Sequence, residues 1–358
     1  MVAIWLVSCS GGGPDTPSQF TAVVSTSITK ATSLPIPTIT PPPPLLQPTL
    51  ISSDTMPVWR ISTSPYTNFG WLPELAVLLY GNRGSSDVWS YDVAARRNKL
   101  YPADYPWLPD AKLLTALPSN ARAVEVSPSG AKTLYTISDA GVAPTSYPDG
   151  EMMYESRPAQ LWIRDNAGTR QLGTVEDCVG GYLWSNDENV VIVLSDAPPR
   201  KCEEAEAWIL NLHTETLAPW QVHSDYDKSV MITDIKDDGS AVLFETLEPE
   251  GSLYIRKLSD NHDTLVLNRP GKSIMGAWLN EGDRLLIDIT DTDPLSNQLW
   301  TYEVGSTELR QLEIPIEKDL FIGRWKLSHD RQWLAFLTEK YDEFQSNGLW
   351  VADLRQVQ

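Results

Sequence analysis

The stretch Gln298–Val304 reads QLWTYEV, and the chain contains a close variant of it five more times. In this stretch Leu, Thr and Glu alternate with Trp, Tyr and Val, so each set falls on one face of an extended backbone. That period of two predicts a β-strand. The other copies are DVWSYDV (87–93), QLWIRDN (160–166), EAWILNL (206–212), SLYIRKL (252–258) and GLWVADL (348–354).

The six copies recur at a nearly constant interval. Their aromatic residues are Trp89, Trp162, Trp208, Tyr254, Trp300 and Trp350, with successive spacings of 73, 46, 46, 46 and 50 residues. A strand pattern with a period in the forties is typical of a β-propeller, in which each repeat is one blade. The spacing therefore predicts several blades that bury their faces against one another.

A second repeated phrase precedes each copy: a polar turn followed by an apolar strand. Examples are SPSGAKTLYTIS (127–138), KDDGSAVLFET (236–246) and SHDRQWLAFLT (328–338). Gly, Asn and Asp supply the positive φ that tight hairpin turns need. With a short last strand, such as LRQLE (309–313), the repeat predicts four strands, a to d. An apolar residue stands before each turn: Trp71, Val126, Trp184, Ile235, Trp278 and Leu327.

The order turn, strand, loop, LWxxDL, turn and xRQL resembles the WD-like repeat of the TolB family, which also occurs in the propeller domains of prolyl oligopeptidases. The resemblance covers residues 56–358 and implies an all-β, six-bladed β-propeller of four-stranded antiparallel blades. The chain has no Gly-x-Ser-x-Gly elbow for a hydrolase domain. In place of the N-terminal α/β domain of TolB it has only a stalk, so a TolB-type role is an analogy.

The last blade is short of one strand. The sequence stops at LWVADLRQVQ (349–358), which leaves too few residues after strand c. The strand-like segment MPVWRISTS (56–64) lies upstream of the first repeat. We predict that it supplies the outer strand of the last blade, which closes the ring and covers a sheet edge.

The N-terminus differs in composition. The tetrad Leu6–Cys9 follows an apolar segment and resembles the bacterial lipobox, although the basic region of a signal peptide is missing. The resemblance implies that residues 1–8 are a signal remnant and that Cys9 is lipidated. Residues 9–55 are rich in Ser, Thr and Pro and predict a disordered stalk, because they offer little apolar surface to bury. We therefore expect an extracytoplasmic protein anchored by lipid to a bacterial membrane.

The charge balance bears on partners. The chain carries 28 Lys and Arg against 47 Asp and Glu, a formal net charge of −19. Such a field repels phosphate, which argues against nucleic acid as a partner. We expect a monomer without a cofactor that binds an envelope protein or peptide.

Two cysteines fall within one repeat. Cys178 precedes strand a of the third blade, and Cys202 lies in its b–c loop. Both connections lie on the same face of an antiparallel blade, so the two thiols are expected to meet there. An extracytoplasmic location favours a Cys178–Cys202 disulfide over two separate thiols.

The inner strands offer the first set of candidate binding residues. If the apolar residue before each turn packs between blades, its neighbours point toward the central channel. This parity places Glu125, Asp234, Arg324 and Lys326 in or near the channel. Their charges either bind a small polar ligand or a peptide end, or form an ion-pair network.

The b–c loops offer the second set, because loops on a rigid scaffold often carry binding. The longest, residues 139–160, contains Tyr147 and Tyr154 as aromatic anchors. Another contains Asp288, Asp291 and Asp293, which are oxygen ligands suited to Ca²⁺ but match no known calcium loop. Acidic turns are also common without any metal.

Two classes of function remain open from the sequence. The first is a binding scaffold that docks protein or peptide on the loop face. The second is carbohydrate or small-ligand binding, or a hydrolase- or lyase-type enzyme, at the channel mouth. For an enzyme only Glu125 and Asp234 are candidate acids, and the four His residues form no paired motif.

Overall fold

In the computed structural model, two units divide the chain, Met1–Leu45 and Leu46–Gln358. All described residues belong to the second unit. They run from 49 to 356, except 56, 63–65, 73–75, 83–87, 102–116, 139–144, 147–151, 154–157, 177, 196–206, 221–229, 248–249, 280–282, 293–294, 318–319 and 341–345. Within this part there is no helix of the length and apolarity that a membrane span requires.

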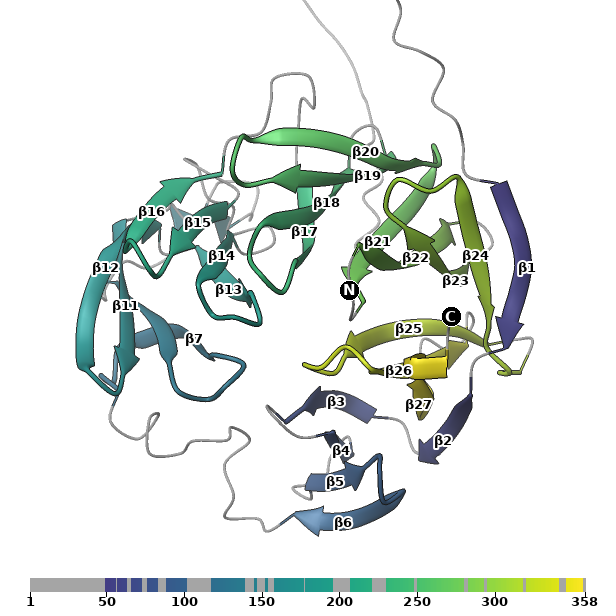
Figure 1. Ribbon diagram of the computed structural model, residues 1–358. Helices are drawn as coiled ribbons and strands as arrows, with labels where there is room; N and C mark the ends of the chain where they lie inside the picture. The colour runs from purple at the N-terminus through teal and green to yellow at the C-terminus, as the bar shows by residue number, and fades with distance from the viewer. Residues whose placement is uncertain are drawn as a thin grey trace, which may run out of the picture. The chain divides into compact units, whose positions relative to one another are not determined.

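The second unit is a six-bladed β-propeller of four-stranded antiparallel sheets, as predicted (Figure 1). Blade one is β3(Tyr66–Trp71), β4(Val77–Asn82), β5(Val88–Asp92) and β6(Arg97–Tyr101). Blade two is β7(Ala121–Val126), β8(Thr133–Ser138), β11(Pro158–Asp165) and β12(Gly168–Glu176). Blade three is β13(Val179–Trp184), β14(Val190–Ser195), β15(Ala207–Asn211) and β16(Thr216–Pro219).

The second half of the ring continues the same plan. Blade four is β17(Val230–Ile235), β18(Ala241–Leu247), β19(Glu250–Lys257) and β20(His262–Asn268). Blade five is β21(Lys272–Trp278), β22(Arg284–Thr292), β23(Leu295–Glu303) and β24(Glu308–Glu313). Blade six is β25(Leu320–Leu327), β26(Trp333–Lys340), β27(Ser346–Asp353) and β2(Val58–Ser62), followed by the short 3-10 helix η1(Leu354–Gln356).

The strand boundaries follow the repeated phrases. Every strand a ends at the apolar residue predicted to precede the turn: Trp71, Val126, Trp184, Ile235, Trp278 or Leu327. The aromatic residue of each repeated heptapeptide lies on strand c, on β5, β11, β15, β19, β23 or β27. The sequence-based prediction of six copies of one unit is confirmed.

The ring closes through the N-terminal strand. β2 pairs antiparallel with β27, with Trp59 opposite Val351. The Trp59 indole packs edge-on against Trp333 at 5.9 Å and donates a 2.7 Å hydrogen bond to the Tyr91 hydroxyl of blade one. Two segments almost 300 residues apart therefore share one blade, which confirms the predicted closure.

One further strand precedes the closing strand. β1(Thr49–Thr55) pairs in parallel with β24 at the outer edge of blade five. These seven residues fall within the range predicted as stalk. Their Ser- and Thr-rich composition gave no strand signal, but an open sheet edge offers backbone hydrogen bonds to any extended segment beside it.

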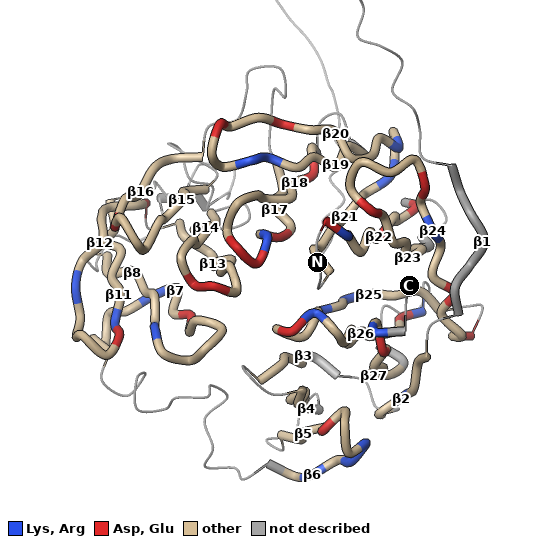
Figure 2. The backbone as a smooth tube through the Cα atoms, viewed as in Figure 1, with Lys and Arg blue, Asp and Glu red and all other residues tan. Residues whose placement is uncertain are grey.

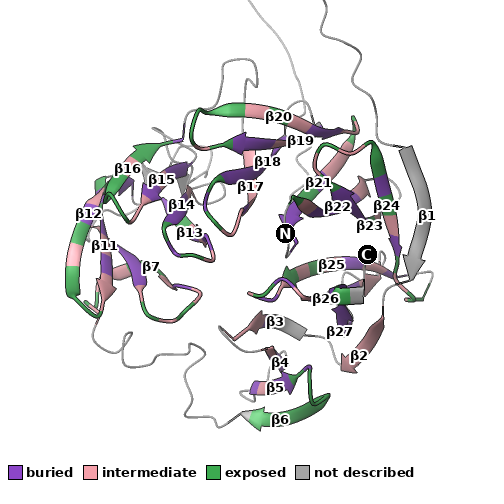
Figure 3. Ribbon diagram, viewed as in Figure 1, coloured by how far each residue is buried: buried purple, intermediate pink, exposed green. Residues whose placement is uncertain are grey.

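Burial is greatest on strands b and c, and the outer strands face solvent (Figure 3). The apolar clusters lie between blades; one joins Leu134 of blade two to Val191 of blade three. Blades of this kind cannot bury both faces alone, so each depends on its neighbours. The inner strands are thereby held in fixed positions around the centre.

Candidate functional site

The turns between strands a and b share one conformation. Their fourth residue donates its N–H to the first residue's carbonyl oxygen at 2.8–2.9 Å in blades two, three, four and six. That fourth residue has a positive φ in each case. It is glycine in Gly130 and Gly239, but Glu188 and Arg331 in blades three and six. An L-residue in this region costs about 1–2 kcal/mol, so these two side chains occupy a strained position.

The Arg331 side chain spans several blades. It donates to Asp234 of blade four, to the Ile235 carbonyl oxygen at 2.9 Å and to the Trp278 carbonyl oxygen of blade five at 2.7 Å. Its Nε also lies 2.5 Å from a carboxylate oxygen of Asp237. The guanidinium is buried, and both of its terminal nitrogens donate to carboxylate and carbonyl acceptors, whereas Nε makes the ion pair with Asp237 without a hydrogen bond. Charged residues lie in these turns, near the centre of the ring (Figure 2).

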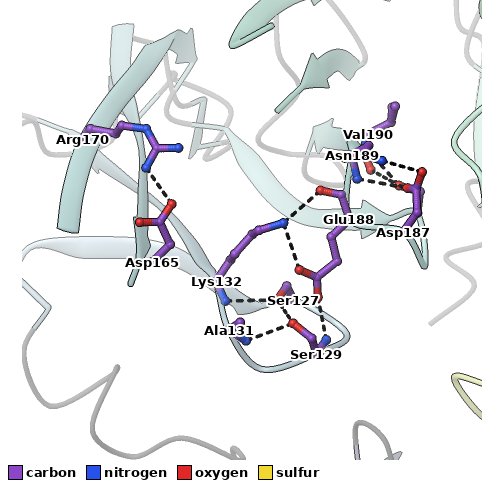
Figure 4. A network of polar contacts seen from close by, with 11 residues as sticks. Ser127, Ser129, Ala131, Lys132, Asp165, Arg170, Asp187, Glu188, Asn189 and Val190 are labelled. Carbon is purple, nitrogen blue, oxygen red and sulfur yellow. Dashed lines mark hydrogen bonds and ion pairs between the residues drawn. The ribbon is translucent and has the colours of Figure 1, made fainter. Parts of the chain in front are cut away.

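Glu188 makes the corresponding link between blades two and three (Figure 4). Its carboxylate accepts the Ser129 N–H at 2.6 Å and lies 3.0 Å from the Lys132 ammonium. Burial opposes the charge, but these hydrogen bonds hold the pKa of Glu188 below its usual range. Blade three also touches blade six across the ring, because the Asn186 amide donates to the His329 carbonyl oxygen at 3.0 Å.

Carboxylates also join successive blades along the inner strands. Glu125 accepts the Tyr182 N–H at 3.3 Å, Asp234 the Trp278 N–H at 2.7 Å, and Glu245 the Ile274 N–H at 2.7 Å. Strand a is the inner edge of each sheet, so some of its N–H groups need acceptors from outside the sheet. The preceding blade supplies them. Asp234 and, in part, Glu125 thus have a structural role.

A cavity of about 410 Å³ lies at the centre, lined by residues of blades two to six. Three of the four predicted channel residues, Glu125, Asp234 and Lys326, line it. Its walls are largely apolar and aromatic, with Tyr182 and Trp325 among them. The alternation of side chains along the inner strands thus places three of the four predicted channel residues at one cavity.

Arg324 does not line this cavity. The pairing of β25 with β26 is irregular between Ile322 and Trp325, and Arg324 falls within that bulge. A bulge breaks the strict alternation on which the parity prediction depends. Both Arg324 and Lys326 are exposed, but only Lys326, which lies beyond the bulge, is part of the cavity lining.

Among the acidic residues that line the cavity, Glu125 is the one whose pKa departs clearly from its ordinary value. Burial raises its pKa to about 7, while the Tyr182 N–H and the Lys326 charge act in the opposite direction. Burial and the nearby Glu125 charge also raise the pKa of the Tyr182 hydroxyl. Burial, followed by the Arg331 charge, lowers the pKa of His329, another cavity residue. The cavity therefore disfavours unpaired charge.

Two of the three aspartates considered for Ca²⁺, Asp288 and Asp291, do not share a face of their strand. β22 is regular from Leu285 to Asp291, so Asp288 and Asp291 project from opposite faces. Asp288 is buried, accepts the Trp325 indole N–H at 2.9 Å and has its pKa raised by burial to about 6. Asp291 pairs with Lys272. Asp293 lies outside the described residues, among which no group of three or more His, Cys, Asp or Glu is arranged for a metal.

Several predicted residues are outside the described part of the chain: Cys9, Tyr147, Tyr154 and Cys202. Cys178 is buried immediately before β13, at the end of the blade where the prediction places it. Its pairing with Cys202 stays a prediction.

Arg331 and Glu188 were missed as key residues from the sequence. A signal was present: the aligned turns SPSG and KDDG end in glycine, whereas SNDE and SHDR end in a long charged residue. Glycine recurs at this turn position because φ is positive there. A long charged residue at the same position indicates that interactions of its side chain offset the backbone strain.

No family model and no curated protein matches this chain. Among solved structures, an oligogalacturonate lyase from Vibrio parahaemolyticus is 10% identical, with a TM-score of 0.46, and covers 81% of this chain and 77% of its own. Prolyl oligopeptidase B from Galerina marginata is 14% identical, with a TM-score of 0.46, over 78% of this chain and 42% of its own. An acylaminoacyl peptidase from Pyrococcus horikoshii is 11% identical, with a TM-score of 0.39, over 73% and 40%.

This chain thus spans 42% and 40% of the lengths of those two peptidases. At such low identity the likeness concerns the propeller fold alone. The lyase and peptidase activities are properties of those proteins.

Proposed function

We propose that this chain is a lipid-anchored, extracytoplasmic propeller of TolB type that binds a protein or peptide at the cell envelope. The central cavity is the observation that supports binding most directly. In this cavity the polar groups of Glu125 and Lys326 lie beside apolar walls, and the packed inner strands hold them in position. A volume of about 410 Å³ falls in the range of roughly 300–1,000 Å³ usual for ligand sites.

The anchoring part of the proposal rests on the sequence. The lipobox-like tetrad ending at Cys9 and the Pro-rich segment after it are suited to a lipid anchor and a spacer. A Cys178–Cys202 disulfide is consistent with the oxidising compartment that this placement requires.

We place the main docking area for a folded partner on the face that carries the b–c loops; the cavity is a second, separate site, since the a–b turn residues Pro128, Asn186 and His329 are among its lining. At the opposite end, bonds between the a–b turns already engage Glu188, Asp234 and Arg331. The loop face also carries the longest connection, with Tyr147 and Tyr154 as aromatic anchors.

A carbohydrate or other small polar ligand is the second candidate. The aromatic side chains of Trp325 and Tyr182 line the same cavity as Glu125, and sugars bind such mixtures of rings and acids. Soaking sugars and peptides against the purified protein separates the two candidates.

A photoreactive residue at position 147 in the native cell tests the docking proposal. We expect it to crosslink one dominant envelope protein, identified by mass spectrometry. The matched control carries the probe at Asp238, in the a–b turn of blade four, and should lose that product. Equal or absent products from both positions contradict docking on the loop face. Separately, Cys9→Ser should release the protein from the membrane fraction.

A further inference from the structure

The Glu125 carboxylate can accept more hydrogen bonds than the described residues give it. Its Oε2 accepts the Tyr182 N–H at 3.3 Å, a length at the weak end for such a bond. Within the described residues, no hydrogen-bond donor reaches its Oε1. Asp234 differs, because two donors, the Trp278 N–H and Arg331, already occupy it. Glu125 is therefore the cavity carboxylate that is able to accept a ligand's hydrogen bonds.

The charged residues that line the cavity are balanced in number. Glu125 and Asp234 are the acids, and Lys326 and Arg331 are the bases. Arg331 is committed to Asp234, which leaves Glu125 and Lys326 as the groups that a ligand can meet. The whole chain has a formal net charge of −19, and this long-range field attracts a cationic ligand and repels a carboxylate ligand.

The wall beside Glu125 also exposes apolar surface. Among the described residues only three large apolar side chains are exposed, and one of them, Met275 on the inner strand β21, lines the cavity. Met275 lines the cavity together with Leu183 and Leu327. Exposed apolar groups beside a partly buried acid fit a ligand that has both a charged head and an apolar body.

We propose that the central cavity binds a primary ammonium group on an apolar stem, with Glu125 as its acceptor, as offered by the amino-terminal residue of a peptide. This inference rests on the proposed peptide-binding function and names the ligand chemistry of its cavity. The ammonium forms charge-assisted hydrogen bonds to Glu125, and the apolar part covers Met275 and Leu183. Capture of an N-terminal amine is one of the recurring modes of peptide recognition.

A positive head group also relieves the cost of ionising Glu125. Burial raises the pKa of this carboxyl to about 7, and only Lys326 faces it with opposite charge. A bound ammonium stabilises the carboxylate, so binding near pH 6 should release a proton from Glu125. A neutral ligand has no such effect.

Isothermal titration of the full chain tests the proposal with leucyl-leucine amide as the probe and its N-acetyl form as the comparison. We expect the free amine to bind at least about tenfold more tightly than the acetylated form, because a hydrogen bond to a charged group is lost. Glu125→Gln should weaken binding of the free amine by a similar factor. This variant keeps an oxygen for the Tyr182 N–H and so preserves the blade contact.

The surface carboxylate Glu303, exposed on β23, provides the matched control as Glu303→Gln. It should bind the probe as the wild type does. Nα-acetyl-lysine amide, whose only amine is on the side chain, identifies lysine as the source if it binds more tightly than the dipeptide amide. Equal binding of free and acetylated probes, or unchanged binding to Glu125→Gln, overturns the proposal. A crosslinked partner at position 147 together with that result leaves peptide docking intact and removes only the ammonium site.

Discussion

Arg331 in blade six forms an ion pair with Asp234 in blade four, and blade five lies between them in the ring. The same guanidinium binds the Trp278 carbonyl oxygen of blade five. One side chain thus links three blades at the a–b end of the channel. Because the surrounding groups bury it, its contribution depends on all of its partners remaining in place.

Replacing Arg331 with glycine should destabilise the propeller by about 3 kcal/mol, because Asp234 and Asp237 lose a buried cation. Glycine relieves the strain of a positive φ, so any loss is due to the side chain's bonds and not to backbone strain. Chemical denaturation followed by Trp fluorescence measures the change.

Glu215→Gly is the control, since Glu215 has a φ of 52° but is exposed. Its surface pair with Arg170 contributes little, so the change should stay within about 1 kcal/mol. Adding Asp234→Asn to Arg331→Gly should recover part of the loss, because the uncompensated charge is removed. Equal effects of the two glycine variants contradict a role for the Arg331 ion pairs.

The sequence was sufficient for the fold because its signals are local and repeated. An apolar residue before a polar turn marks the end of strand a at Trp184 and Trp278 alike. The partners of the charged residues depend instead on how distant blades face one another. Nothing near Asp234 in the chain indicates Arg331, 97 residues later. The bulge that removes Arg324 from the cavity also depends on pairing with β26 rather than on local composition.

The Glu188 link should make the fold sensitive to acid. The pKa of Glu188 lies below its unfolded value, so its stabilising effect is present above pH 4.5 and is lost as pH falls through the folded-state pKa. Glu188→Gln, which cannot ionise, should be less stable than the wild type at pH 7, and this difference should shrink on acidification toward pH 3. A difference that is constant over this range would show that the carboxylate charge contributes nothing. Urea denaturation at successive pH values provides the measurement.

Two truncations separate the roles of the N-terminal strands. Removing residues 1–56 deletes β1 but keeps β2, so the ring should stay closed and soluble. Removing residues 1–64 also deletes β2, which exposes the β27 edge and removes the Trp59 contacts with Trp333 and Tyr91. We expect this shorter chain to aggregate, or to unfold at a temperature at least about 10 °C lower, because a buried aromatic and a whole strand are lost. Similar melting curves for the two truncations would contradict closure by β2.

Glu125 should give the propeller a stability that falls as pH rises toward neutrality. Burial raises its pKa from 4.5 to about 7, so the folded state holds this proton more tightly than the unfolded state does. The resulting stabilisation is complete below pH 4.5 and is lost as pH rises through about 7. For a shift of this size it amounts to about 3 kcal/mol.

Glu125→Gln removes this titration but keeps an acceptor for the Tyr182 N–H. Because Asp288 and other groups titrate in both proteins, the informative quantity is the wild-type free energy of unfolding minus that of the variant, measured from pH 4.5 to 8. We expect this difference to decrease by about 2–3 kcal/mol across the range and to level off above pH 8. Glu303→Gln should show no such trend, since that carboxyl is exposed on β23. A flat difference for Glu125→Gln would mean that Glu125 is ionised at low cost, and the cavity would then lack the environment that favours an ammonium ligand.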